Sequence, residues 1–231
     1  MNLPTLASLP ARPQRRWLPA GLAALLILTG CVSQPARADP SANVAPYQPR
    51  NFAGDPVLPA TLRRVVLLPV CTGGIAPPET AEGLDRALLA ALQKQTRFEV
   101  VTLSREESRL WFGAAEISSA SALPPDYLGR LAAKFAAEGV LFVDLTVYQP
   151  YRPLSVGFRA KLALTAGIRI AWTFDEVISA GDPGVAGRAR RAYQQADRTS
   201  GQVDLSPTVL QSPGRFAAFA AEAMFQTLPP R

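Results

Sequence analysis

The sequence predicts an α/β (α+β) protein: a single domain with a mixed sheet flanked by helices, preceded by a signal peptide and a proline-rich tether. Three observations favour this class. Apolar strand-like runs alternate with helical patterns up to residue 148, two further strand-like runs then follow each other directly, and a helical pattern closes the chain. Alternation of strands and helices is typical of parallel pairing, whereas consecutive strands pair as antiparallel hairpins, so we expect both in one sheet.

Residues 1–30 have the pattern of a secretory signal peptide. Arg12, Arg15 and Arg16 precede an apolar run over residues 17–28, and no acidic residue occurs before Asp39. A helix that crosses a bilayer needs about 20 apolar residues, so this shorter run is not expected to remain as a membrane span.

The apolar run ends in Leu28-Thr29-Gly30-Cys31, which resembles the lipobox of bacterial lipoproteins. The resemblance implies cleavage before Cys31, a diacylglyceryl group on its thiol and an acyl chain on its new amine, with no other cofactor. Val32 stands where an aspartate commonly retains such proteins in the inner membrane, so the resemblance favours an outer-membrane anchor with the domain facing the periplasm, and the inner membrane is the alternative. An ordinary signal peptide with a chance cysteine, or an uncleaved anchor, also stays open.

The chain is therefore expected to consist of a lipoprotein signal peptide (1–30), a lipidated cysteine with a proline-rich tether (31–60) and a periplasmic α/β domain (61–231). Prolines recur throughout 35–59, which is typical of an extended, semi-rigid linker. Tyr47 and Phe52 could pack back on the domain and order the last third of this tether.

The first half of the domain contains two strand-like runs and three helical patterns. An apolar run rich in β-branched residues predicts a strand buried on both faces, and residues 97–103 alternate like a second strand. Ser104 is suited to cap the second helix, and residues 113–123 predict a loop. The expected elements are a strand at 64–70, a helix from Pro78 through Leu92, a strand at 97–103, a helix from Ser104 through Trp111, and a helix from Asp126 closing near Gly139.

The second half predicts strands and one terminal helix. Residues 140–148, 156–164 and 167–174 are strand-like, and the last two are expected to form a hairpin near Thr165-Ala166-Gly167. Ser212 followed by Pro213 is a helix start, and Phe216 and Phe219 face inward from that helix.

Composition excludes several kinds of chemistry. The chain has no histidine, which excludes histidine-based triads and ordinary zinc sites, and we predict no metal. No G-x-S-x-G or S-x-x-K motif occurs. Loss of the three leader arginines lowers the formal net charge from +6 to +3, so nucleic-acid binding is not expected. Cys71 is interpreted as a small buried residue, with a reactive thiol or an intermolecular disulfide as the alternative.

Two of three carboxylates could be imagined to form a catalytic pair. Asp175 and Glu176 are neighbours at the end of a predicted strand and should therefore point to opposite faces of the sheet. Asp144 lies inside an apolar strand, either at an edge or turn, or buried with a partner. Because no pair converges, the sequence predicts no catalytic residue and no enzyme.

Two clusters are candidates for partner binding. Arg188, Arg190 and Arg191 form the strongest local positive charge, which is either a solvated helix face or a docking patch for an anionic partner. The stretch from Tyr148 to Leu154 contains Tyr151 and Arg152 between prolines. It is either a rigid crossover packed by its aromatic rings or a contact surface.

The run Val65-Val66-Leu67-Leu68-Pro69-Val70, the later strand Gly139-Val140-Leu141-Phe142-Val143 and the strand that ends in Trp172 resemble a periplasmic α/β module. That module occurs in the N-terminal domain of the Tol–Pal translocation protein, and related folds occur in penicillin-binding-protein activator lipoproteins and the curli-secretion lipoprotein. The resemblance covers about residues 62–176 and implies a fold more than an activity.

Together these observations predict a membrane-anchored lipoprotein that acts as a non-catalytic envelope adaptor or assembly and binding module. Its expected partners are the membrane, through the lipid, and an envelope protein or cell-wall polymer. The alternatives are a carboxylate-dependent cell-envelope enzyme and a ring or pore subunit of an export system.

Overall fold

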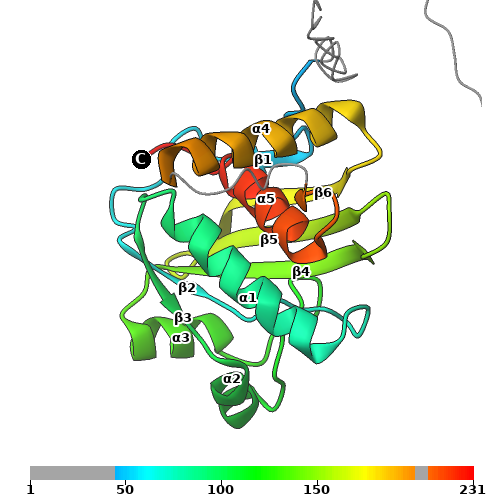
Figure 1. The fold of residues 1–231 in the computed structure, drawn as a ribbon. Coiled ribbons are helices and arrows are strands. Elements are labelled where there is room, and N and C mark those ends of the chain that lie inside the picture. The colour runs from blue at the N-terminus through cyan, green and yellow to red at the C-terminus, as the bar shows by residue number, and fades with distance from the viewer. Residues whose placement is uncertain (1–44, 201–207) are drawn as a thin grey trace, which may run out of the picture. The chain divides into compact units, whose positions relative to one another are not determined.

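The computed structural model describes residues 45–200 and 208–231, and it contains a six-stranded sheet with flanking helices (Figure 1). The strands are β1 (Phe52–Gly54), β2 (Arg64–Leu67), β3 (Glu99–Thr102), β4 (Gly139–Gln149), β5 (Ser155–Leu164) and β6 (Arg169–Ser179). The helices are α1 (Pro78–Gln93), α2 (Arg105–Phe112), α3 (Tyr127–Phe135), α4 (Pro183–Ser200) and α5 (Pro213–Phe225). The predicted signal peptide, Cys31 and the first part of the tether lie outside the described residues.

The sheet is mixed, with strand order β1-β6-β5-β4-β2-β3. Strand β2 pairs in parallel with both β3 and β4, because α1 and the α2–α3 segment supply the crossovers that parallel strands need. Strands β4, β5 and β6 follow each other through short connections and pair antiparallel, and β1 adds antiparallel to β6. This topology confirms the predicted fold class, a single α+β domain with a mixed sheet.

Apolar residues fill a layer on each side of the sheet at β2, which lies between β4 and β3. Val65 and Leu67 belong to the larger core, which α1 and α5 cover, whereas Val66 and Leu68 belong to the smaller core beneath α3. Side chains alternate along a strand, so a continuous apolar run supplies both layers. The run was predicted to be buried on both faces, and it is.

The proline-rich stretch joins the sheet before it ends. Phe52 lies opposite Phe174 in the register of β1 with β6, and the Asp55 N–H donates to the Ala171 carbonyl at 2.9 Å. Leu58 is buried in the larger core. The last third of the predicted tether is therefore ordered on the domain in this structure.

Three element ends differ from the sequence predictions by three residues or more, and other ends shift by one or two residues. Strand β2 ends at Leu67 because Pro69 has no N–H for the ladder, and the contact with β4 resumes as an isolated bridge at Cys71. Helix α3 ends at Phe135 because Ala136 adopts a left-handed φ of 48°. Strand β6 continues to Ser179 because its pairing with β5 extends that far. Among the described residues, no helix has the length and apolar character needed to cross a bilayer.

Candidate functional site

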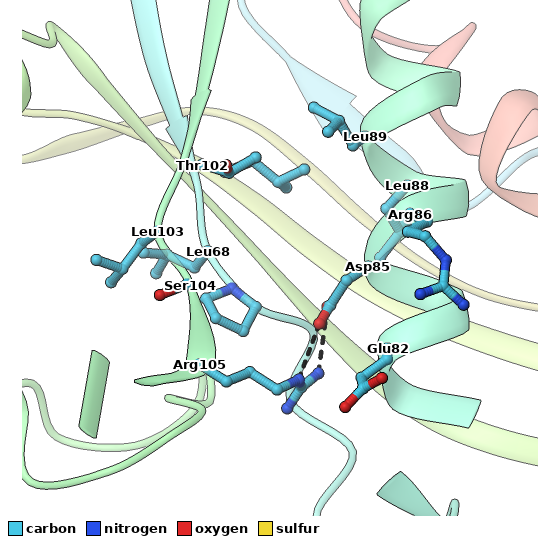
Figure 2. A pocket seen from close by; sticks show the side chains of 12 residues that line it. Leu68, Glu82, Asp85, Arg86, Leu88, Leu89, Thr102, Leu103, Ser104 and Arg105 are labelled. Atoms are coloured by element: carbon cyan, nitrogen blue, oxygen red, sulfur yellow. Dashed lines mark hydrogen bonds and ion pairs between the residues drawn. The ribbon is translucent and has the colours of Figure 1, made fainter. Parts of the chain in front are cut away.

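A groove of about 340 Å³ lies between α1 and the carboxyl ends of β2 and β3 (Figure 2). Ligand sites in open α/β sheets commonly lie at the carboxyl ends of the parallel strands, which makes this groove the leading candidate site. Leucines form much of its surface and charged groups lie at one end. Its lining consists of Leu67, Leu68, Pro69, Glu82, Asp85, Arg86, Leu88, Leu89, Thr102, Leu103, Ser104 and Arg105.

Arg105 organises the charged end of the groove. Ser104 and Glu107 form a reciprocal capping box that starts α2, so Arg105 occupies the first turn of the helix beside α1. Its Nε donates to Asp85 Oδ2 at 2.8 Å and its Nη2 donates to Asp85 Oδ1 at 3.2 Å. Nη1 donates to Glu116 Oε2 at 2.9 Å. One guanidinium thus joins α1, α2 and the loop after α2.

The same network satisfies the backbone where β2 stops. The Val70 N–H donates to Asp85 Oδ1 at 2.8 Å, and the Val70 carbonyl accepts from Arg105 Nη2 at 2.9 Å. Arg105 and Asp85 therefore replace the ladder partners that Val70 loses after Pro69. Buried backbone groups without partners are costly, so this pairing has a structural reason independent of any ligand.

Glu116 holds the turn that follows β2. Its carboxylate accepts from the Gly73 N–H at 3.2 Å and from the Thr72 hydroxyl. Burial alone would raise the pKa of Glu116, but the hydrogen bonds from Thr72, Arg105 and Gly73 outweigh it and hold that pKa below its ordinary value. Burial also raises the pKa of the nearby Cys71 thiol, which disfavours the nucleophilic thiolate.

The candidate catalytic carboxylates are fixed by their surroundings. Asp144 is 6% exposed and accepts from the Ser119 N–H at 3.0 Å and from the Ser119 hydroxyl. Asp175 accepts from Arg159 Nε at 2.8 Å, and Arg159 lies between Asp144 and Asp175 in the register of β4, β5 and β6. Glu176 accepts from the Tyr47 hydroxyl at 2.9 Å. Asp144 is thus the buried polar group with a partner that the sequence allowed.

Glu176 and Arg188 fasten the start of the described chain to the domain. Glu176 accepts from the Arg50 N–H at 2.8 Å as well as from the Tyr47 hydroxyl. Arg188 donates from Nη1 to the Tyr47 carbonyl at 2.7 Å, and its guanidinium lies 5.9 Å from the centre of the Tyr47 ring. Desolvation lowers the pKa of Arg188. We call these contacts of Tyr47, Arg50, Glu176 and Arg188 the tether clasp.

The predicted partner-binding residues lie in different places. Arg188 is directed inward into the tether clasp, Arg190 is half-buried and Arg191 is exposed on α4. Tyr148 lies on β4 and lines a shallow pocket between α1 and α5. Tyr151 is 80% exposed in the β4–β5 connection, and Arg152 beside it is also exposed. The structure therefore does not gather these residues into one surface, and Cys31 lies outside the described residues.

Sequence reasoning missed Arg105, Asp85 and Glu116. They lie on separate elements, and their spacing matches no motif, so no local pattern marks them as a cluster. The available signal was the capping pattern from Ser104 to Glu107, which places residue 105 in the first turn of a helix. Within residues 45–200 and 208–231, no three potential metal-ligating side chains form a group that could hold an ion.

Three solved structures are similar to parts of the chain. The chain matches the PelC dodecamer from Paraburkholderia phytofirmans at 11% identity and a TM-score of 0.47, over 78% of this chain and 96% of that one. It matches the lipoprotein GNA1162 from Neisseria meningitidis at 16% identity and a TM-score of 0.41, over 61% and 99% respectively. The LpoB C-terminal domain from Salmonella enterica matches at 18% identity and a TM-score of 0.34, over 49% and 81%. No family model and no curated protein matches the chain.

Proposed function

We propose that the chain is a lipid-anchored bacterial lipoprotein whose domain acts as a non-catalytic adaptor or assembly and binding module of the cell envelope. The basic and apolar leader and the segment Leu28-Thr29-Gly30-Cys31 support export and lipidation of Cys31. Val32 supports the outer membrane as the destination, with the domain facing the periplasm. An envelope protein or a cell-wall polymer is the proposed partner.

One observation carries the non-catalytic part of the proposal. Asp144, Asp175 and Glu176 each accept a hydrogen bond from a fixed neighbouring group, and Asp144 is covered by Ser119. A general acid or base needs a titratable group within hydrogen-bond reach of a substrate. Carboxylates that hold strands and loops together serve structure instead, which favours binding over catalysis.

We expect Cys31→Ser to abolish lipid attachment and to prevent cleavage of the leader. The thiol is the group at that position that takes the diacylglyceryl group, and the amine that would be acylated is freed only by cleavage at the lipidated cysteine. Intact-mass spectrometry measures both effects. Cys71→Ser is the matched control and should leave lipidation unchanged. A wild-type chain that retains Met1, or that is cleaved without lipid, would contradict the proposal.

We expect Asp144→Asn and Asp175→Asn, singly and together, to complement the envelope phenotype of a strain that lacks this chain. Asparagine keeps the shape and an acceptor oxygen but cannot transfer a proton as a carboxylate does. Complementation at wild-type protein levels is the measurement. Loss of complementation by a variant that folds and accumulates normally would favour the carboxylate-enzyme alternative.

The adaptor proposal itself is tested by reversible crosslinking of the full lipidated chain in cells, followed by affinity purification. We expect one reproducible envelope protein or cell-wall fragment, and failure to recover any would count against the proposal.

Size-exclusion chromatography with light scattering of the purified chain in detergent tests the alternative of a ring or pore subunit. A stable high-order oligomer would favour a ring or pore subunit.

A further inference from the structure

We infer that β3 and the groove beside it bind an extended segment of another envelope protein, which adds a strand to the sheet and places an apolar side chain between β3 and α1. This inference rests on the proposed adaptor function and specifies the kind of partner. The open strand edge, the groove beside it and their position in the fold support it independently.

The backbone of β3 has an open edge. The Glu99 N–H donates to the Arg63 carbonyl at 2.8 Å and the Leu103 N–H donates to the Leu67 carbonyl at 3.1 Å, so these groups face β2. Backbone groups alternate in direction along a strand, which turns the N–H and carbonyl groups of Val100 and Thr102 away from β2. Because β3 is the last strand of the sheet, no described strand lies on that side.

The groove lies beside the same two residues. Val100 packs against the core beneath α1, and Thr102 lines the groove, so both side chains face the α1 side of the sheet. An added strand next to Val100 and Thr102 would direct every second side chain to that side. Leu89 on α1 is only half-buried, and it offers an apolar surface to such a side chain.

Charge at one end of the groove favours a basic residue in the bound segment. Asp85 and Glu116 share the single guanidinium of Arg105. In Figure 2, Glu82 extends from α1 toward Arg105, whereas Arg86 extends away from it. The groove lining carries two carboxylates and two cations, but Arg105 is also shared with Glu116 and Arg86 extends away. A lysine or arginine next to the apolar side chain would therefore complement Glu82.

The open edge of β3 lies at the opposite side of the sheet from the first described strand. The tether joins the sheet through β1, which is the opposite edge strand from β3. Five strand spacings of about 4.8 Å separate these edges by roughly 24 Å. In Figure 1 the first described residues lie near β1 and α4, and α2 lies at the other end of the domain. A partner segment at β3 would therefore not compete with β1 for its place on the sheet.

Photo-crosslinking in cells tests the inference on the full lipidated chain. A benzophenone amino acid at Thr102 is expected to crosslink one envelope protein, and mass spectrometry should map the crosslink to a segment with a basic residue beside an apolar one. A benzophenone at Thr173, on β6 far from β3, is the control position. If Thr173 captures the partner and Thr102 does not, the β3 inference fails and the adaptor function stands. If neither position nor chemical crosslinking captures a partner, both fail.

Three variants of the Thr102 crosslinker chain decide whether the edge and the groove are responsible. Val100→Pro removes a backbone N–H that points away from β2 and leaves the hydrogen bonds to β2 in place. Leu89→Glu places a charged side chain in the groove. Each substitution should lower the crosslink yield at least tenfold. Leu110→Glu changes a leucine that is 76% exposed on α2 and should leave the yield unchanged. Circular dichroism and urea titration confirm folding.

Each remaining outcome overturns the inference. Wild-type yield in folded Val100→Pro and Leu89→Glu chains would show that neither the edge nor the groove is used. A crosslinked species with twice the mass of the chain would identify a second copy as the occupant, and crosslinks to lipid or glycan alone would show that no protein segment binds there.

Discussion

Trp172→Ala is expected to lower the free energy of unfolding by about 3–5 kcal/mol, the usual cost of removing a large aromatic side chain from a core. Trp172 is 1% exposed on β6, and its ring centre lies 6.3 Å from those of Phe174 and Phe225. Its Nε1 donates to the Thr227 hydroxyl at 3.1 Å. The substitution leaves a cavity between the sheet and α5 and also removes a donor from Thr227, so both losses act in the same direction.

Urea titration of the wild type and the variant measures this loss from the shift of the transition midpoint at a constant slope. Trp111→Ala is the matched control, because Trp111 is half-buried on α2 and packs mainly against Phe135 and Lys134. It should cost roughly 1 kcal/mol, in keeping with a partly exposed aromatic pair. Equal losses in the two variants would contradict the assignment of Trp172 to the centre of the core.

Arg105→Met is expected to destabilise the domain by about 2–3 kcal/mol, between the cost of breaking a surface pair and that of breaking a fully buried one. Methionine retains much of the apolar stem but leaves the Asp85 and Glu116 carboxylates without their shared cation. The Val70 carbonyl also loses its donor. Arg159→Met is the control, because the Arg159–Asp175 pair is more exposed, and it should cost less than about 1 kcal/mol.

The pH dependence of unfolding separates charge from packing at Arg105. The pKa of Glu116 is lowered in the folded chain, so its contribution to stability is complete above its ordinary pKa and is lost as the pH falls through the lowered value. Wild-type stability should therefore decline below about pH 4.3, the ordinary glutamate value. Without the guanidinium, the lowering at Glu116 shrinks and this part of the acid-dependent loss becomes smaller. An unchanged acid profile in Arg105→Met would assign the effect to packing alone.

The sequence was sufficient to predict the fold class because local patterns and tertiary structure agree along most of the chain. The apolar run from Val65 to Leu68 feeds two cores, and a run buried on both faces is distinctive at the sequence level. Ser104 and Ser212 both accept hydrogen bonds from the helices they precede, as their positions predicted. These features depend on neighbours within a few residues, which the sequence displays directly.

The ends of the strands and the residues of the groove were harder to predict from the sequence, because they depend on contacts with residues far away in the chain. Ser179 belongs to a strand only because Ser155 of β5 lies opposite it. Arg188 looked like part of a surface charge cluster, yet its guanidinium reaches the carbonyl of Tyr47, more than one hundred residues earlier. Arg105 likewise meets Asp85 and Glu116 only after the crossover of α1 is made. Contacts between residues so far apart in the sequence cannot be predicted from their spacing along the chain.

The tether clasp has a consequence for how far the domain can travel from a membrane. The chain from Tyr47 onward is fastened to the domain, so it adds no length between the domain and the proposed anchor. With the anchor proposed at Cys31, about fourteen residues lead to Ala45, and a fully extended chain of that length spans at most roughly 50 Å. In a chain lipidated at Cys31, the tether clasp would therefore keep the domain within that distance of the bilayer, where a partner held at the same membrane would meet it at a high effective concentration.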